Sequence, residues 1–268
     1  MLSLLCKRSI KVSNLRKTCC RGFWSNNQTM ANPIILDSNP KDSPKAIVVF
    51  LHGLGDTGQG WSDIFKYQLP GLKNDKVKYL FPTAEQLPVT LNGGFKMHSW
   101  YDLHGLKTDI DQYLPEDTEG IEKASQKLTD LVDQELELYP NLTTKNVILS
   151  GFSQGGSVAL YTAFNRSNID KDNLYGGVIG LSTYLPLRDS FLANDHQIIK
   201  NMKDTKVFIG HGDIDEVVPH QFGKAAFELV ANFNPEIESR FETYKYLGHS
   251  CNQEEMDHVK EFIEKFVS

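Results

Sequence analysis

Short runs of consecutive apolar residues alternate with longer amphipathic segments from residue 43 onward, and this alternation constrains the fold more than any other feature. Two runs, 47–51 (IVVFL) and 147–149 (VIL), contain no polar residue, which is typical of strands that are buried on both faces. We expect strands at residues 46–51, 77–81, 146–150, 177–181, 206–210 and 241–246.

The clearest helical pattern covers residues 120–138, where apolar residues recur every three or four positions. Similar patterns cover 156–164, 221–233 and 253–266. Strands that alternate with helices predict an α/β fold, with a mostly parallel central sheet flanked by helices in a single domain. Residues 82–107 have no clean period, and a loop of this length in a compact domain usually covers or lines a binding site.

Charge divides the chain into a basic leader, residues 1–36, and an acidic body, residues 37–268. Six of the 28 Lys and Arg residues lie in the leader, which contains no Asp or Glu, so the body carries the other 22 together with all 34 acidic residues. Such a body repels polyanions, and nucleic acid is not an expected partner. Mean hydropathy is -0.36 and no apolar stretch approaches the length of a membrane span, so we expect at most peripheral membrane contact.

The leader is open to three interpretations. Residues 1–29 have the basic, acid-free composition of an organellar targeting segment, which favours mitochondrial import. Alternatively, Cys19 and Cys20 are acylated and anchor the chain to a membrane surface. In the third interpretation the leader is a tail that is bypassed by starting at Met30. Only Cys251 lies in the body, so an internal disulfide there is excluded, as in proteins of reducing compartments.

The first glycine motif, G-x-G-x-x-G at residues 53–58 (GLGDTG), follows the first expected strand. In a dinucleotide-binding fold, the next strand ends in an acidic residue that binds the ribose hydroxyls. Here the next strand is followed by Pro82, and the nearest acid, Asp75, precedes it. A dinucleotide-binding oxidoreductase is therefore a remote alternative.

The second glycine motif, G-x-S-x-G at residues 151–155 (GFSQG), lies directly between an expected strand and an expected helix. In a nucleophile elbow this turn is so tight that the serine adopts a strained backbone and points into the cleft. Glycine is needed on both sides because a Cβ atom there would collide with a neighbouring strand or helix. An ordinary turn does not explain both glycines, so we predict that Ser153 is a nucleophile.

A serine nucleophile needs a base, and the base needs an acid that orients it. In hydrolases with this elbow, the acid and then the histidine follow the serine, on loops at the carboxyl ends of later strands. Here Asp213 and Asp215 follow the fifth expected strand, and His249 follows the sixth. Parallel strands would place all of them at one edge of the sheet with Ser153. The order of residues leaves the choice between the two aspartates open.

The other histidines and the cysteine of the body have simpler interpretations. His52 and His211 directly follow strands, and we interpret them as buried rings that anchor loops. His98 and His104 belong to the long loop and could line the cleft. No H-E-x-x-H motif or Cys/His cluster is present, so no metal site is predicted, and Cys251 is interpreted as a packing residue.

Three long motifs are familiar from one enzyme family: residues 50–58 (FLHGLGDTG), 151–156 (GFSQGG) and 211–219 (HGDIDEVVP). They resemble the acyl-protein thioesterases, which are lysophospholipase-like carboxylesterases of the α/β-hydrolase fold. Shorter matches are PVTLN at 88–92, SWYD at 99–102 and LPLR at 185–188, so that the likeness spans residues 45–268. The resemblance implies that residues 37–268 form an α/β-hydrolase catalytic domain.

The resemblance also implies the roles of individual residues. Ser153 would be the nucleophile, Asp215 the acid and His249 the base. The backbone N–H groups of Leu54 and Gln154 would form the oxyanion hole, which agrees with the usual construction from the residue after the nucleophile and an earlier loop. No cofactor is expected, because this chemistry needs only the protein.

In the family the long loop shapes a channel for the acyl chain. Apolar residues of this loop that could line such a channel are Leu87, Val89, Leu91, Phe95 and Trp100. Ordinary core packing is the alternative for all five. The sequence Gly93-Gly94-Phe95 departs from the family pattern and leaves the preferred chain length open.

The sequence thus predicts a serine hydrolase that cleaves palmitoyl thioesters from protein cysteines through an acyl-enzyme. A lysophospholipase or short-chain carboxylesterase is the main alternative, because one triad attacks both ester types. The expected substrates are S-palmitoylated proteins or lysophospholipids. A catalytically silent binding module is disfavoured, since all three triad residues are present. The resemblance implies a cytoplasmic and also nuclear location, against the mitochondrial one that the leader favours, and the oligomeric state is not predicted.

Overall fold

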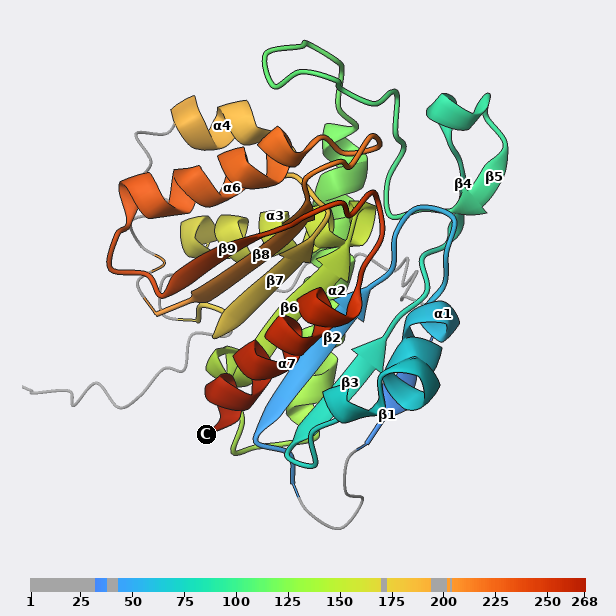
Figure 1. Ribbon diagram of the computed structural model, residues 1–268. Helices are drawn as coiled ribbons and strands as arrows, with labels where there is room; N and C mark the ends of the chain where they lie inside the picture. The colour runs from blue at the N-terminus through green and yellow to red at the C-terminus, as the bar shows by residue number, and fades with distance from the viewer. Residues whose placement is uncertain (1–31, 38–42, 170–172, 194–201, 203) are drawn as a thin grey trace, which may run out of the picture.

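The computed structural model describes residues 32–37, 43–169, 173–193, 202 and 204–268 (Figure 1). The targeting segment, the acylated anchor and the start at Met30 that we considered for the leader lie outside these residues. Helices cover both faces of a central sheet, which confirms the predicted α/β-hydrolase fold. In the described part of the chain, no helix is both long and apolar enough to cross a membrane.

The central sheet has seven strands in the order β1-β3-β2-β6-β7-β8-β9, and all neighbours are parallel except β1 and β3. The strands are β1 (Ile34–Leu36), β2 (Ala46–Leu51), β3 (Val77–Phe81), β6 (Val147–Phe152), β7 (Gly177–Leu181), β8 (Lys206–Gly212) and β9 (Ser239–Tyr244). All the strands expected from the sequence are present, with shifts of at most two residues at their ends. Parallel pairing brings the loops after β6, β8 and β9 to one edge.

Strand β1 is missing from the sequence prediction. It pairs antiparallel with β3, with Ile34 opposite Phe81, so the sheet begins inside the segment that we assigned to the leader. Three residues are too few to show a period, and this strand is recognisable only through its partner.

The helices form two layers (Figure 1). One face of the sheet is covered by α1 and α7, and the other by α2, α3, α4 and α6. Their bounds are α1 (Gly58–Asp63), α2 (Thr118–Glu137), α3 (Gln154–Ile169), α4 (Arg188–Ala193), α6 (His220–Phe233) and α7 (Gln253–Val267). A π-helical stretch, Ile64–Gln68, continues α1, and short 3₁₀ turns span Pro70–Leu72, Thr90–Asn92 and Thr144–Asn146.

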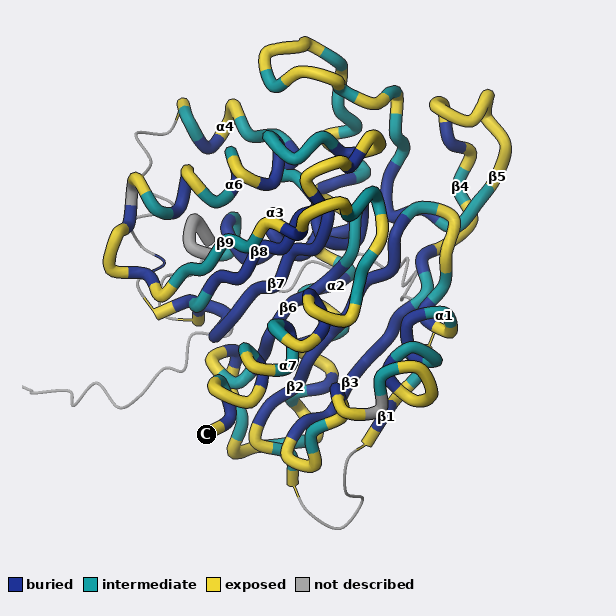
Figure 2. The backbone as a smooth tube through the Cα atoms, in the orientation of Figure 1, coloured by how far each residue is buried: buried dark blue, intermediate teal, exposed yellow. Residues whose placement is uncertain are grey.

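Alternate residues of each central strand belong to two different hydrophobic cores. In β2, Val49 and Leu51 pack on the α2 and α3 side, whereas Val48 and Phe50 pack on the α1 and α7 side. The central strands are buried along their length (Figure 2). Burial on both faces is why the sequence of β2 shows a continuous apolar run instead of alternation.

The segment predicted as an aperiodic loop, residues 82–107, contains a small hairpin. Strands β4 (Gln86–Pro88) and β5 (Lys96–His98) pair antiparallel and project from the body of the molecule (Figure 1). Gly93 and Gly94 form its tip with φ of 63° and 80°, a region that glycine enters freely. Strands of three residues give no periodic signal, which explains the missed hairpin.

A buried ion pair joins β3 to α2, and its removal gives a test of the packing. Lys78 and Glu135 are paired with side chains 6% and 8% exposed, and Lys78 Nζ also donates to Tyr139 Oη at 3.1 Å. We expect Lys78→Met to lower the free energy of unfolding by about 3–5 kcal/mol, because it leaves a buried carboxylate without its partner. The double variant Lys78→Met/Glu135→Leu should recover most of this loss. Denaturant unfolding measures the stability of both variants. A double variant as unstable as the single one would show that the unpaired carboxylate of Glu135 is not the cause of the loss.

Candidate active site

Ser153 lies in the turn between β6 and α3 with φ of 52°, the left-handed region that side chains rarely adopt. Glycine flanks this turn for steric reasons. A Cβ atom on Gly155 would lie 2.3 Å from the carbonyl oxygen of Leu51, and one on Gly151 would lie 2.5 Å from the carbonyl carbon of Gly155. The turn therefore presses directly against the end of β2, and the backbone of Ser153 takes up the strain.

Two hydrogen bonds hold this strained serine in place. Its N–H donates to the carbonyl of Leu181 at 2.9 Å, and the hydroxyl of Thr183 donates to its carbonyl at 2.7 Å. Leu181 ends β7, the neighbouring strand, and Thr183 lies two residues after it. The backbone of Ser153 is thus held by the neighbouring strand and the residues just after it.

Hydrogen bonds connect Ser153, His249 and Asp215 in a chain. His249 Nε2 lies 3.0 Å from Ser153 Oγ, and His249 Nδ1 lies 2.8 Å from Asp215 Oδ2. Since the carboxylate only accepts, Nδ1–H donates to Asp215, and Nε2 is free to accept from the serine hydroxyl. Asp213 has a different position, because its Oδ1 accepts the N–H of Tyr246 at 2.6 Å. The geometry thus places Asp215, and not Asp213, against His249.

Asp215 is a fully buried carboxylate with several donors. Its Oδ1 accepts the N–H groups of Val217 and Val218, both at 2.9 Å. Burial alone would raise the pKa of Asp215, but hydrogen bonds from His211, His249 and Val218 outweigh it and hold the pKa well below its usual range. Asp215 is therefore ionised at neutral pH and can stabilise a protonated His249.

The loop after β2 approaches the serine closely. A Cβ atom on Gly53 would lie only 3.5 Å from the Cβ of Ser153. The N–H of Gly55 donates to the carbonyl of His98 at 2.8 Å, which ties this loop to β5. Among the described residues, no acceptor faces the N–H groups of Leu54 and Gln154. Two unused donors beside a serine are what an oxyanion hole requires.

His52 is a buried ring that anchors this loop, as expected from the sequence. Its Nδ1–H donates to the carbonyl of Gly53 at 2.7 Å, and its Nε2 accepts the N–H of Ala84 at 3.0 Å. Burial lowers the pKa of His52, in agreement with a neutral ring. The indole N–H of Trp100 donates to the carbonyl of His52 at 2.8 Å. Trp100 thus supports the loop that carries Leu54.

The side chain of Gln154 has a role that sequence reasoning missed. Its amide oxygen accepts the N–H of Trp100 at 3.1 Å, and its amide nitrogen donates to the carbonyl of Tyr101 at 2.9 Å. Gln154 therefore fixes the start of the loop that follows β5, in addition to its backbone position beside Ser153. The sequence offered one sign of this role: Gln154 is a long polar residue directly after Ser153, in a turn that is enclosed by a buried strand and a helix. A polar side chain that is buried there needs hydrogen-bond partners.

The five predicted acyl-channel residues do not share one cavity. Leu87 and Trp100 line a cavity of about 330 Å³ beside the start of α2. Val89 is buried, whereas Leu91 and Phe95 are exposed on the hairpin, Phe95 by 74%. Their role in acyl binding stays a prediction.

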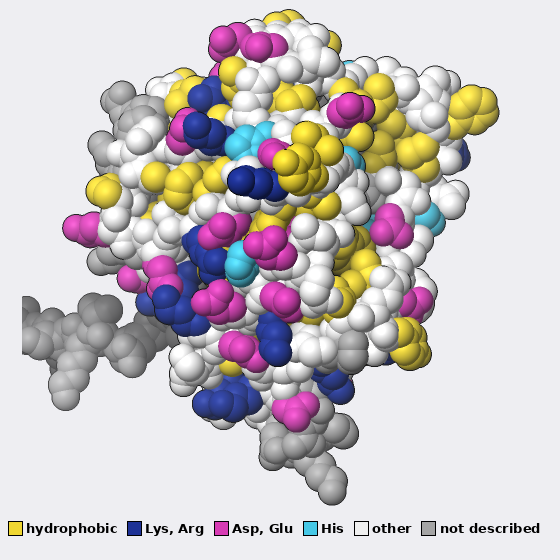
Figure 3. All heavy atoms as spheres, in the orientation of Figure 1, with side chains coloured by type: hydrophobic (Ala, Val, Ile, Leu, Met, Phe, Trp, Pro, Cys, Tyr) yellow, Lys and Arg dark blue, Asp and Glu magenta, His cyan; other side chains and the backbone are white. Residues whose placement is uncertain are grey.

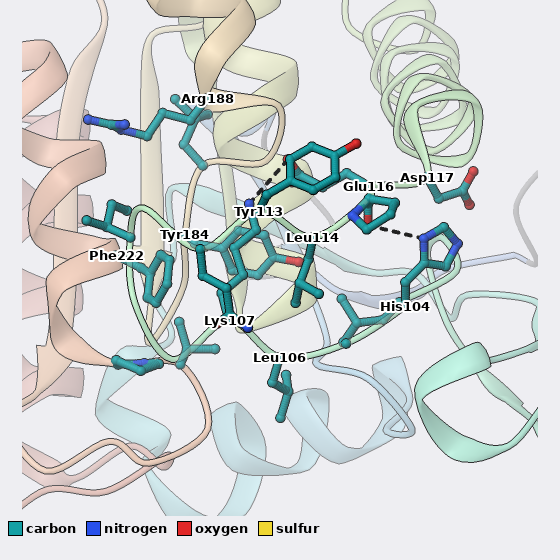
Figure 4. A pocket seen from close by; sticks show the side chains of 18 of the residues that line it. His104, Leu106, Lys107, Tyr113, Leu114, Glu116, Asp117, Tyr184, Arg188 and Phe222 are labelled. Atoms are coloured by element: carbon teal, nitrogen blue, oxygen red, sulfur yellow. Dashed lines mark hydrogen bonds and ion pairs between the residues drawn. The ribbon is translucent and has the colours of Figure 1, made fainter.

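A cavity of about 340 Å³ lies between the loop of residues 103–117 and the segments that follow β7 and β8 (Figure 4). Val217 and Val218, which donate to Asp215, also line it, so the cavity adjoins the Ser153–His249–Asp215 chain. Its apolar walls come from Tyr101, Leu106, Leu114, Tyr184, Leu185 and Phe222. Figure 4 shows the guanidinium of Arg188 pointing away from these side chains.

Of the histidines predicted in the long loop, His104 lines this cavity, whereas the Nδ1–H of His98 donates to the carbonyl of Ala84 at 2.6 Å. Cys251 is partly buried, and burial raises the pKa of its thiol to about 11, which suits a packing residue. Within the described ranges, no group of three or more His, Cys, Asp and Glu side chains is arranged to hold a metal ion.

Apolar side chains are also exposed around the site. Ile214 and Val217 flank Asp215, and Tyr246 precedes His249 with 86% of its surface exposed. Hydrophobic side chains are more frequent in the upper part of the face in Figure 3, where the loops after the strands lie, than in the lower part. The surroundings of the cleft therefore suit an apolar ligand.

Comparison with known proteins identifies the family. The sequence profile of the phospholipase/carboxylesterase family matches residues 34–267. The chain belongs to this family.

Individual relatives confirm the resemblance seen in the motifs. An acyl-protein thioesterase 1 homologue of Dictyostelium discoideum is 36% identical over 82% of this chain and 90% of its own length. Acyl-protein thioesterase 1 of Candida albicans is 33% identical over 84% of this chain and 94% of its own length. The crystal structure of Zea mays acyl-protein thioesterase 2 superposes with a TM-score of 0.72 at 27% identity, covering 88% of this chain and 99% of that one.

This phospholipase/carboxylesterase contains a second buried carboxyl that interacts electrostatically with Asp215. Glu255 of α7 is fully buried, and among the described residues neither of its carboxyl oxygens has a hydrogen-bond partner. Burial, and then the charge of Asp215, raise the pKa of Glu255 to about 8. Glu255 is therefore mainly protonated at neutral pH. The sequence gives no warning, because acidic residues at the start of a helix are usually solvated.

Glu255→Gln gives a test through the pH dependence of stability. The pKa of Glu255 is higher in the folded protein than the ordinary value of 4.5, so the unfolded chain loses this proton first. Stability of the natural protein should therefore fall between about pH 4.5 and pH 8 relative to the variant. The difference should reach a few kcal/mol, since one pKa unit is about 1.4 kcal/mol. Denaturant unfolding at several pH values measures it, and parallel pH profiles would show that Glu255 is solvated.

Proposed function

We propose that this protein is a serine hydrolase that cleaves fatty-acyl thioesters of protein cysteines. The observation that carries the proposal is the hydrogen-bonded chain Ser153–His249–Asp215 beside a cavity with apolar walls. Kinship with acyl-protein thioesterases supports the thioester as the bond that is cleaved and palmitoylated proteins as the substrates.

Acylation begins when His249 Nε2 takes the proton of the Ser153 hydroxyl as the oxygen attacks the acyl carbonyl carbon. The ionised Asp215 stabilises the imidazolium that forms. When the tetrahedral intermediate collapses, the bond from carbon to sulfur breaks and the imidazolium returns its proton to the leaving thiolate. The cysteine of the substrate protein departs as a thiol, and the acyl group stays on Ser153 as an ester.

The negative charge of the tetrahedral oxygen is stabilised by the N–H groups of Leu54 and Gln154. Each such donor typically lowers the barrier by about 3 kcal/mol. In the second half-reaction His249 removes a proton from water, which attacks the ester. The fatty acid leaves and the hydroxyl of Ser153 is restored, so that no cofactor is consumed.

We place the acyl chain in the cavity under the loop of residues 103–117. Burial of each CH₂ group of such a chain contributes about 0.8 kcal/mol, so apolar walls favour long acyl groups. Oxygen esters react by the same steps, and a lysophospholipid would fill the cavity with the same chain. The rate of hydrolysis of a palmitoylated protein relative to that of a lysophospholipid decides between a depalmitoylating enzyme and an enzyme of lipid turnover.

The first test uses Ser153→Ala. This variant should lose labelling by a fluorophosphonate probe, and its kcat on a palmitoylated-cysteine peptide should fall by about a million-fold, as in serine proteases without their nucleophile. Labelling that survives the substitution would refute the role of Ser153. The natural enzyme should hydrolyse the palmitoyl peptide faster than palmitoyl-lysophospholipid, and the reverse preference would move the function to lipid turnover.

The acyl site is tested by Leu114→Trp, which narrows the cavity. We expect kcat/KM for a palmitoyl thioester to fall at least about tenfold, while an acetyl thioester is cleaved at a nearly unchanged rate, because only the long chain enters the narrowed part. Tyr67→Trp is the control, since Tyr67 is 75% exposed on the π-helical stretch Ile64–Gln68 and does not line this cavity. Equal losses for both chain lengths would place the acyl chain elsewhere.

A further inference from the structure

A second histidine lies against the aspartate of the catalytic chain. His211, at the end of β8, is completely buried, and its Nε2 lies 3.4 Å from Asp215 Oδ2. This is the same carboxylate oxygen that accepts the Nδ1–H of His249. Nothing in the reaction steps above uses His211, although it lies next to the group that orients the base.

The hydrogen bonds of His211 define where its proton is. Nε2 lies 2.7 Å from the carbonyl oxygen of Val218, and a carbonyl only accepts, so Nε2 carries the hydrogen. Nδ1 is buried and, among the described residues, has no partner. A proton on Nδ1 would be a buried donor without an acceptor, which is costly. His211 is therefore built into the fold as a donor through Nε2.

The packing around the ring is equally specific. A Cβ atom on Gly223 of α6 would lie 2.3 Å from His211 Nδ1, so only glycine leaves room for the imidazole. The ring is thus pressed from α6 toward Val218 and Asp215. A side chain that only filled space would not need this close approach together with a donor that bonds the carbonyl of Val218 beside a carboxylate.

We propose that His211 is a positioning residue of this hydrolase: its Nε2–H, which donates to the carbonyl of Val218 and faces Asp215 Oδ2 at 3.4 Å, limits the negative charge that Asp215 presents to His249. The proposal rests on the proposed function, because it concerns the same Ser153–His249–Asp215 chain. Without this donor, Oδ2 would interact with His249 alone and would bind the imidazolium more strongly. His249 would then hold its proton to higher pH, and a smaller fraction of the enzyme would have the free base at lower pH.

Several other titratable groups face this cluster. Asp213 lies in the same loop, the ring of His220 on α6 is centred 5.7 Å from that of His211, and Glu255 of α7 interacts with Asp215. His220 is held by Thr243 at 2.9 Å. These groups are unchanged in the His211 variants below, so a difference in the pH dependence of labelling between those variants reports on His211.

The experiment compares His211→Phe with His211→Gln. Phenylalanine keeps a planar ring without a donor, whereas the glutamine amide can place an N–H close to the position of Nε2. The acid limb is the fall of the labelling rate at low pH, where His249 holds a proton. We expect His211→Phe to move this limb of fluorophosphonate labelling upward by about half a pH unit or more, which lowers the rate by about threefold at pH values below the limb and leaves the rate above the limb nearly unchanged. His211→Gln should keep the limb of the natural enzyme unshifted, and its labelling rate should match that of the natural enzyme on both sides of the limb. For the palmitoyl peptide, kcat at pH values below the limb should fall in His211→Phe with little change in KM.

Gly223→Ala tests the same point with the imidazole still present, in case His211→Phe does not fold. The added Cβ displaces the ring, and alanine favours the helix, so we expect a shift of the acid limb in the same direction. An acid limb that is unmoved in the folded variants would overturn the proposal and leave His211 as a structural residue. Labelling requires only a reactive Ser153, so an enzyme that labels normally but cleaves no thioester would refute the substrate proposal and still report on His211.

Discussion

Contact between two pieces of backbone, the turn at Gly155 and the end of β2 at Leu51, governs the geometry of the whole site. Because no side chain fits between them, the chain turns sharply and Ser153 is forced to a φ of 52°. The same contact brings the loop after β2 beside the serine, where Leu54 and Gln154 have unused N–H groups. A strained serine and two free donors are therefore products of one steric constraint, and the sheet holds them without help from a ligand.

Two buried carboxyl groups in one neighbourhood have opposite protonation states. Asp215 receives N–H donors on both oxygens and stays ionised, whereas Glu255 receives none and keeps its proton. Burial acts in the same direction on both, so the number of donors decides the difference. Near Asp215, a protonated Glu255 avoids a second buried negative charge beside the first.

The sequence was sufficient for those parts of the structure that depend on local pattern. Continuous apolar runs identified the parallel strands, and glycine on both sides of Ser153 identified the turn that strains it. Residues alone could not choose between Asp213 and Asp215, because both follow the same strand and only the fold decides which one faces His249. The cavity also escaped prediction, since its walls come from separate segments that no local period connects. Side-chain roles of Gln154 and Glu255 depend on burial, which single-sequence patterns do not reveal.

Strand β1 sets a limit on how far the amino-terminal end can be shortened. Residues 34–36 cover the outer edge of β3, so that the sheet ends in a strand of three residues with Ile35 partly exposed. A chain that is shortened to begin just before Ile34 keeps β1 paired with the edge of β3. Trimming beyond Leu36 would leave the N–H and C=O groups of β3 open along a longer and more apolar strand, which is the kind of edge on which another chain can add by pairing. The part of the chain that the sheet requires therefore begins at an edge strand, several residues before the first strand of the buried core.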